Sequence, residues 1–165
     1  MDNQELLERL HQRNDDPEKK KEHQEFRKYV VFNLNTFVFA IPAEDVREIS
    51  FDNTIYYVPF LPPYIKGFAN RHGQPYTVFD VLLLFKNESL DTGALLILNL
   101  PQDQACLLIT DVDEIIKVPL EQVHSISSED EDSKYFLESI TLNEQEVFVL
   151  NSHRLLERLE MDLDR

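Results

Sequence analysis

The chain has 165 residues, of which 31 are acidic and 16 are basic, so its formal net charge is −15. This length fits a single domain, and so negative a surface repels phosphate, which disfavours nucleic acid and anionic membranes as partners. Three glycines and one cysteine exclude a glycine-rich phosphate loop, an intramolecular disulfide framework and a cysteine-rich zinc site. The sequence has no signal-peptide core and no apolar run of roughly 18 residues, so we expect a cytoplasmic protein without membrane insertion.

Residues 1–28 are predicted to form a polar, partly helical extension. Leu6, Leu7 and Leu10 indicate a short amphipathic helix, whereas Pro17 and the charged residues after it indicate a polar linker. Two interpretations of this extension stay open. It is either a solvated tail or a helix that docks on another surface.

The rest of the chain carries the short periodicity of β-structure, because β-branched and aromatic residues alternate between turn residues. We predict strands at residues 29–34, 37–41, 49–57, 68–70, 76–79, 95–100, 105–110, 114–118, 136–142 and 147–150. We predict helical segments at residues 43–46, 81–85 (with Asp80 as N-cap) and 152–159, and an acidic loop at 127–133. About ten short strands at roughly 8–12-residue spacing indicate antiparallel barrels or a sandwich.

The sequence offers no catalytic or metal-ligating constellation. The histidines have no ligand spacing and share no motif with an acidic cluster, so we interpret them as surface residues: His11, His23, His72, His124 and His153. Cys106 lies in an apolar run typical of a buried position, and the acidic run 129–132 lacks the glycine turn of a calcium loop. We therefore predict no catalytic residue, no metal site and no cofactor, which leaves a binding module.

One stretch, residues 63–81, carries a specific succession of motifs: Pro-Tyr-Ile-Lys-Gly-Phe-Ala-Asn-Arg-His-Gly-Gln-Pro-Tyr-Thr-Val-Phe-Asp-Val. It resembles the signature of the CheW-like domain family, in which a proline, Ile-Lys-Gly, Asn-Leu-Arg-Gly and Val-x-Asp-Leu follow at these spacings. Three further segments resemble other elements of the family: residues 46–49 (Val-Arg-Glu-Ile), residues 112–115 (Val-Asp-Glu-Ile), and residues 149–151 with the leucines at 155 and 156. The resemblance covers residues 27–159.

The resemblance implies a mainly β fold of two small five-stranded SH3-like β-barrels on a shared core, with short helices and a C-terminal helix. It divides the chain into the extension 1–28, a CheW-like domain at 29–160 and a tail at 161–165. It also implies a function without catalysis. Such an adaptor couples the signalling tips of methyl-accepting chemotaxis receptors to the regulatory domain of a CheA-type histidine kinase, and barrel-end packing could add weak self-association.

The resemblance also implies residues that bind a partner, receptor or kinase: Val46, Glu48, Ile49, Gly67, Asn70, Arg71, His72 and Gly73. Gly67 and Gly73 fit either plain turns or the close approach of a partner's backbone. Val46 fits a receptor groove or the core, and Glu48 fits a solvated strand position as well as a binding site.

The chain departs from the family pattern both within the signature and beyond it. Arg71 and His72 stand where the family has Leu-Arg, so the charge shifts by one position and histidine replaces a permanently charged arginine. Thr77 replaces a usual proline, and Thr110 and Asn151 replace usual aspartates. These departures concern partner specificity, so the alternative function is a divergent CheW-like interaction module of another sensory or motility pathway. A third class, an enzymatic or small-molecule-binding barrel, would need a concave site with converging polar groups.

Overall fold

Helix α1 (Asn3–Asn14) confirms the helix predicted near the N-terminus. The computed structural model describes residues 2–14, 24–91, 93–127 and 129–164. Leu6 and Leu7 are exposed on α1, and the segment 15–23 of the predicted linker lies outside the described residues. Within the described part of the chain, no helix is both long and apolar enough to cross a bilayer.

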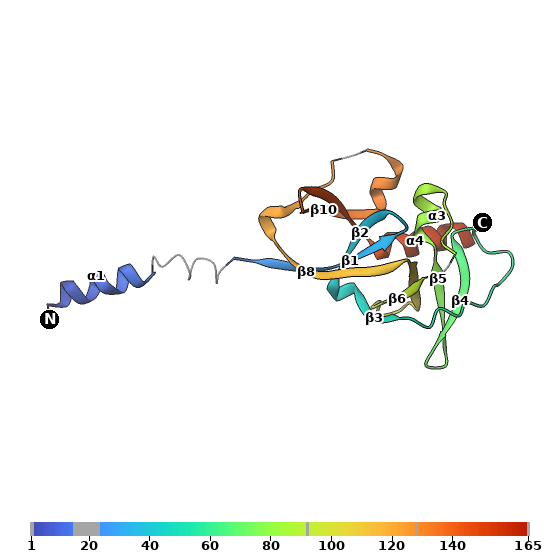
Figure 1. Ribbon diagram of the computed structural model, residues 1–165, viewed down its shortest axis with the longest axis horizontal. Coiled ribbons are helices and arrows are strands. Elements are labelled where there is room, and N and C mark those ends of the chain that lie inside the picture. The colour runs from blue at the N-terminus through green and yellow to red at the C-terminus, as the bar shows by residue number, and fades with distance from the viewer. Residues whose placement is uncertain (1, 15–23, 92, 128, 165) are drawn as a thin grey trace.

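The first sheet contains six strands in the order β8-β1-β2-β11-β10-β9. Figure 1 labels β8, β1, β2 and β10 of this sheet. Its strands are β1 (Phe26–Leu34), β2 (Phe37–Pro42), β8 (Asp111–Pro119), β9 (Val123–His124), β10 (Phe136–Leu142) and β11 (Gln145–Leu150). The predicted β1–β2 hairpin forms because Asn35 adopts a φ of 56° and Leu34 pairs with Phe37 across the turn.

The second sheet contains five strands in the order β3-β6-β7-β5-β4. Its strands are β3 (Val46–Ser50), β4 (Ile65–Arg71), β5 (Gln74–Phe79), β6 (Ala94–Leu98) and β7 (Ala105–Ile109). Every residue of β6 and β7 is buried, because these central strands lie between other elements on both faces. The predicted site residues all lie on β3, on β4 or in the turn that joins β4 to β5.

Neither sheet is a closed barrel. The first sheet has six strands rather than five, and the strand pairings leave β8 and β9 at its edges and β3 and β4 at the edges of the second sheet. Among the described strands the very short β9 pairs with β10 alone, and a long connection separates β3 from β4. The expectation of two five-stranded SH3-like barrels is therefore confirmed only as a mainly β fold with two sheets and a C-terminal helix.

The strand predicted at residues 49–57 begins and ends earlier than expected. It is β3 (Val46–Ser50), which follows the 3-10 helix η1 (Ala43–Asp45). The Asp52 carboxylate accepts hydrogen bonds from the backbone N–H and the hydroxyl of Thr54, at 3.2 and 2.9 Å. This turn satisfies local polar groups without a strand partner, so the chain leaves the sheet here.

Three short elements were not predicted: two 3-10 helices and the strand β9 (Val123–His124). The acidic segment expected to be a loop contains the 3-10 helix η3 (Glu131–Tyr135). The 3-10 helix η2 (Leu120–Gln122) leads into β9. All three elements are too short to give a hydrophobic period in the sequence.

Helix α3 (Val81–Lys86) begins at the predicted cap. The carboxylate of Asp80 accepts a hydrogen bond from the N–H of Leu83 at 3.1 Å. The helix ends at Asn87, whose φ of 55° is left-handed and stops further helical hydrogen bonding. A polar residue at each end therefore limits α3 to six residues.

Helix α4 (Ser152–Leu163) is the predicted closing helix and extends to Leu163. Asn151 precedes it as the N-cap, its side chain accepting a hydrogen bond from the N–H of Arg154, and the helix buries Leu155 against the core. The hydroxyl of Tyr64 donates a hydrogen bond of 2.6 Å to the carboxylate of Asp162. An apolar contact near one end and a polar one near the other thus fix α4 against the second sheet.

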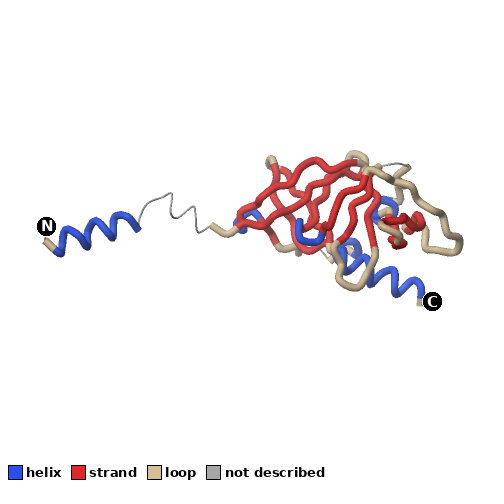
Figure 2. The backbone as a smooth tube through the Cα atoms, turned by 90° about the horizontal axis from the view of Figure 1, so that it is seen from below, coloured by secondary structure: helices blue, strands red, loops and turns tan. Residues whose placement is uncertain are grey.

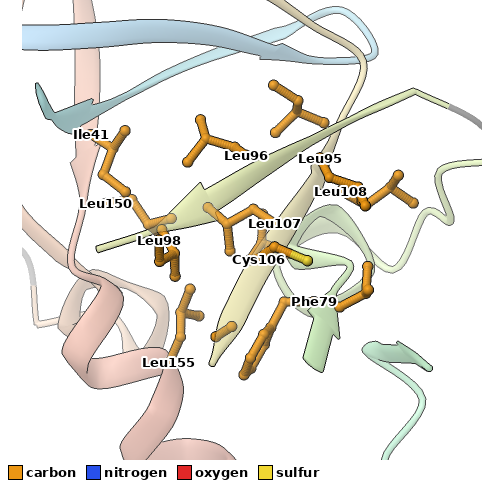
Figure 3. Packing of buried hydrophobic residues seen from close by; sticks show 14 of the residues in the cluster. Ile41, Phe79, Leu95, Leu96, Leu98, Cys106, Leu107, Leu108, Leu150 and Leu155 are labelled. Carbon is orange, nitrogen blue, oxygen red and sulfur yellow. The ribbon is translucent and has the colours of Figure 1, made fainter. Parts of the chain in front are cut away.

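The two sheets share one apolar core. Figure 3 shows Ile41 of β2 and Leu150 of β11 beside residues of β6 and β7. Cys106 of β7 is fully buried in this cluster, and burial raises the pKa of its thiol to about 12. The thiol is therefore protonated at neutral pH and packs as a hydrophobe.

Candidate functional site

The predicted residues Asn70, His72 and Gly73 lie at the tip of the β4–β5 hairpin, coloured green in Figure 1. Arg71 pairs with Gln74, so His72 and Gly73 form the turn, with φ of 51° and 79°. Two left-handed residues are what a type I′ turn requires, which explains glycine at the second position. The Asn70 side-chain oxygen accepts a hydrogen bond of 3.0 Å from the Gly73 N–H. The turn geometry thus accounts for Gly73 and leaves the side chains of Asn70 and His72 exposed.

Arg71 joins opposite edges of the five-stranded sheet. Its Nε donates to Glu48 Oε1 at 3.0 Å, a second guanidinium nitrogen forms an ion pair with the same oxygen, and a third donates to the Ser50 hydroxyl at 3.1 Å. Glu48 and Ser50 belong to β3, whereas Arg71 belongs to β4. The side chains of Arg71 and Glu48 are 21% and 36% exposed. The pair is therefore held in place by the sheet and also reachable from solvent.

Gly67 lies directly against another part of the same chain. Its φ is 142°, and a Cβ at this position would lie 2.1 Å from the carbonyl oxygen of Tyr56. Tyr56 and Phe68 exchange backbone hydrogen bonds of 2.7 and 2.9 Å, which hold the β3–β4 connection on β4. Gly67 therefore permits a close backbone approach within the protein itself.

Val46 and Ile49 lie on β3 and pack, half buried, against the shared core. The pairing of β3 with β6 shifts between Val46 and Glu48, which marks a bulge at Arg47. Arg47 donates a hydrogen bond of 3.0 Å to the hydroxyl of Tyr76. The structure thus joins Glu48 to Arg71 and the hairpin, while Val46 and Ile49 contribute to the core.

A groove of about 470 Å³ borders this face. Arg47 and Tyr76 line one wall, and Leu156 and Leu159 of α4 line another. The groove therefore lies between the second sheet and the C-terminal helix. None of the eight predicted site residues lines it, although Arg47 lies between two of them in the sequence.

Sequence reasoning missed the aromatic loop, which we define as Phe51, Tyr56, Tyr57 and Phe60. Their side chains are 85%, 61%, 78% and 100% exposed. The loop connects β3 to β4 and forms the right-hand end of the molecule in Figures 1 and 2. Exposed aromatic side chains in such a group are typical of a surface that binds another protein. The available signal was four aromatic residues and three prolines within 51–63, with no alternation.

Two other signature residues hold the fold together. Asp80 is fully buried, and its carboxylate accepts hydrogen bonds from the N–H groups of Leu83 and Leu90, at 3.1 and 3.0 Å. Lys66 forms an ion pair with the same carboxylate at 3.5 Å, and the Ser89 hydroxyl lies 3.4 Å from it. The match to the family at Lys66 and Asp80 is thus explained by structure rather than by partner binding.

The site has the chemistry of a binding surface. It combines an exposed ion pair, a polar hairpin tip and the aromatic loop. The described ranges of the chain contain no group of three or more His, Cys, Asp or Glu side chains arranged to hold a metal ion.

A comparison with protein families matches residues 28–160 to the CheW-like domain. The chain belongs to the CheW-like domain family. A solved structure similar to this CheW-like chain is that of the scaffolding protein TtCheW from Thermoanaerobacter tengcongensis, with a TM-score of 0.74 at 21% identity. The similarity covers 81% of this chain and 94% of that one, and it shows the same fold. A search of curated proteins finds no match.

The departure of this CheW-like domain at Arg71 and His72 has a clear structural meaning. The shifted arginine is the last residue of β4, where its guanidinium reaches Glu48. His72 occupies the turn, where its backbone is left-handed and its side chain is exposed. The domain therefore carries the arginine of this motif on the strand and an imidazole ring at the tip.

Proposed function

We propose that this CheW-like protein is a non-catalytic chemotaxis adaptor that couples receptor signalling tips to the regulatory domain of a CheA-type histidine kinase. The family match over residues 28–160 is the observation that carries this proposal. Residues 29–160 act as the adaptor domain, flanked by the extension 1–28 and the tail 161–165. We also propose that the protein works in the cytoplasm without a cofactor and that it self-associates weakly.

The partner surface, which binds one of the two partners, consists of the aromatic loop, the hairpin tip and the pair between Glu48 and Arg71. The other partner binds through a separate face. Apolar aromatic side chains next to an arginine are the combination most enriched at the centre of protein interfaces. Each interface would bury roughly 1,000–1,600 Å² and bind with micromolar affinity. Val46 and Ile49 support this surface from the core side of β3.

Phe60→Asp is expected to weaken binding of the kinase regulatory domain or the receptor tip by at least about tenfold, or about 1.4 kcal/mol. Phe60 is fully exposed and has a φ of 66°, a conformation that aspartate tolerates better than phenylalanine. The Tm should therefore stay within a few degrees of the native value. Isothermal titration calorimetry with each partner measures the affinity.

A matched control places the same charge on an exposed hydrophobe elsewhere. Leu137 is 47% exposed on β10, outside the proposed partner surface. Leu137→Asp should leave both affinities within about twofold. Equal affinities of the native protein and Phe60→Asp for both partners would show that the aromatic loop is not part of the interface.

Exchanging the charges of Glu48 and Arg71 separates binding from stability. Arg71→Ala alone should weaken partner binding and lower the free energy of unfolding by about 1 kcal/mol or less, because the pair is partly exposed. The double variant Glu48→Arg/Arg71→Glu restores an ion pair with the two charges exchanged. The free energy of unfolding should therefore recover, while the affinity for the partner stays as low as in Arg71→Ala. Urea unfolding and calorimetry measure the two effects. Recovery of both would mean that the pair only supports the fold.

One observation favours the alternative, a CheW-like module of another sensory or motility pathway. Helix α1 exposes Leu6 and Leu7, a pattern suited to a partner specific to the extension. Because β1 begins at Phe26, deleting residues 1–23 spares the sheets. Loss of a partner on this deletion would favour the alternative, whereas retained kinase and receptor binding favours the chemotaxis adaptor.

A further inference from the structure

A second apolar surface, the aromatic groove, shares no residue with the proposed partner surface. We define it by the rings of Phe39, Phe85, Phe136 and Phe148 at its floor and by Asp130–Asp132 at its rim. Its volume is about 650 Å³. The floor residues come from β2, β10 and β11 of the first sheet and from α3, so the groove lies where α3 packs beside that sheet.

The floor is a preformed cluster of rings. The centroid of Phe136 lies 5.9 Å from that of Phe39, 5.1 Å from that of Phe85 and 5.4 Å from that of Phe148. These separations fall in the range of favourable aromatic pairs, which stabilise one another in position. Phe148 remains 38% exposed, and the adjacent Val38 remains 37% exposed. An apolar surface is therefore open to solvent and needs no rearrangement to bind.

The rim gives the groove a negative charge. Asp130, Glu131 and Asp132 are all exposed, and Lys86 is the one basic residue among the described residues that line the groove. The Lys86 ammonium lies 5.0 Å from the centroid of the Phe37 ring, within cation–π range. The groove thus already accommodates a cation against Phe37, which also lines it. Its carboxylates attract further positive charge and repel nucleic acid and anionic lipid.

We propose that the aromatic groove binds a helix of a partner protein whose apolar side chains are flanked by lysine or arginine. Such a helix lays apolar residues at i, i+3, i+4 and i+7 into a groove, and leucine-sized side chains would cover the rings. The flanking cations would then meet Asp130–Asp132. A small cation alone would leave the exposed parts of Phe148 and Val38 uncovered.

The test uses the full-length protein and a labelled synthetic helix of leucine and lysine, with a leucine–glutamate helix of the same pattern as control. Fluorescence anisotropy at physiological salt should give micromolar binding of the leucine–lysine helix only. Asp130→Lys/Asp132→Lys should weaken it at least about tenfold. Val38→Asn, which removes apolar surface without adding charge, should also weaken it, and circular dichroism should show both variants folded.

A matched charge reversal away from the groove separates specific binding from general attraction to an acidic protein. Asp113 and Glu114 are exposed on β8 and do not line the groove. Asp113→Lys/Glu114→Lys should change the affinity by no more than about twofold. Equal losses for the two double variants would overturn the proposal. Two other results would also overturn the proposal. One is binding of the leucine–glutamate helix, and the other is binding of tetramethylammonium by a protein that does not bind the leucine–lysine helix.

Discussion

Asp80→Ala is expected to lower the free energy of unfolding by about 2–4 kcal/mol, the combined effect of a lost N-cap and an orphaned buried N–H. The variant removes the acceptor for the N–H groups of Leu83 and Leu90, and Leu90 is itself buried. It also removes the ion-pair partner of Lys66. Urea unfolding followed by circular dichroism measures the change, and the Tm should fall by roughly 5–15 °C.

Two further variants show which part of the Asp80 contacts matters. Asp80→Asn keeps an acceptor for the helix cap and loses the charge, so it should cost less than alanine. Asp91→Ala removes an exposed carboxylate from the same connection and should stay within about 0.5 kcal/mol of the native protein. A loss below about 1 kcal/mol for Asp80→Ala would mean that the buried network does not hold α3 and the following loop.

Gly67→Ala is expected to cost about 3 kcal/mol or more, because it combines backbone strain with a steric overlap. The φ of 142° is unfavourable for any residue with a Cβ, and that atom would lie 2.1 Å from the Tyr56 carbonyl oxygen. The β3–β4 connection must move away from β4, which breaks the hydrogen bonds between Tyr56 and Phe68. Urea unfolding measures the loss, and hydrogen exchange at the Phe68 amide reports the displaced loop.

Gly73→Ala is the matched control for Gly67→Ala. Gly73 also has a positive φ, but no atom lies within 4 Å of its added Cβ. Its cost should be about 1 kcal/mol, from the left-handed backbone alone. Similar losses in the free energy of unfolding for the two variants would show that the contact between Gly67 and Tyr56 tolerates an added Cβ. The Gly67 variants displace the aromatic loop, so lost binding in them would not identify a direct partner contact.

Local patterns predicted most of the fold. The alternation of β1 and β2, the turn at Asn35 and the cap at Asp80 are set by neighbours in the chain, and each was predicted correctly. The end of β3 was placed wrongly because the apolar residues after it suggest a strand. The Asp52 turn instead leaves those residues on a loop, and a single side chain with that effect gives little periodic signal.

The candidate site was less predictable, because its parts meet through distant contacts. Glu48 and Arg71 were both named from the family resemblance, but their ion pair spans two edge strands that no local pattern places together. Gly67 was expected in a plain turn or against a partner's backbone, whereas it lies within β4 against Tyr56 of the β3–β4 connection. The aromatic loop was overlooked because exposed aromatic side chains cannot be told from buried ones before the fold is known.

The most direct test of the adaptor function is calorimetric titration of the full-length protein with a CheA-type kinase regulatory domain and, separately, with a chemoreceptor signalling tip. We expect both to bind with micromolar affinity, through interfaces that do not exclude each other, so that a ternary complex forms. Phe60→Asp and Leu137→Asp serve as the interface variant and its control in the same titrations. Binding of neither partner by the folded native protein would contradict the proposed function.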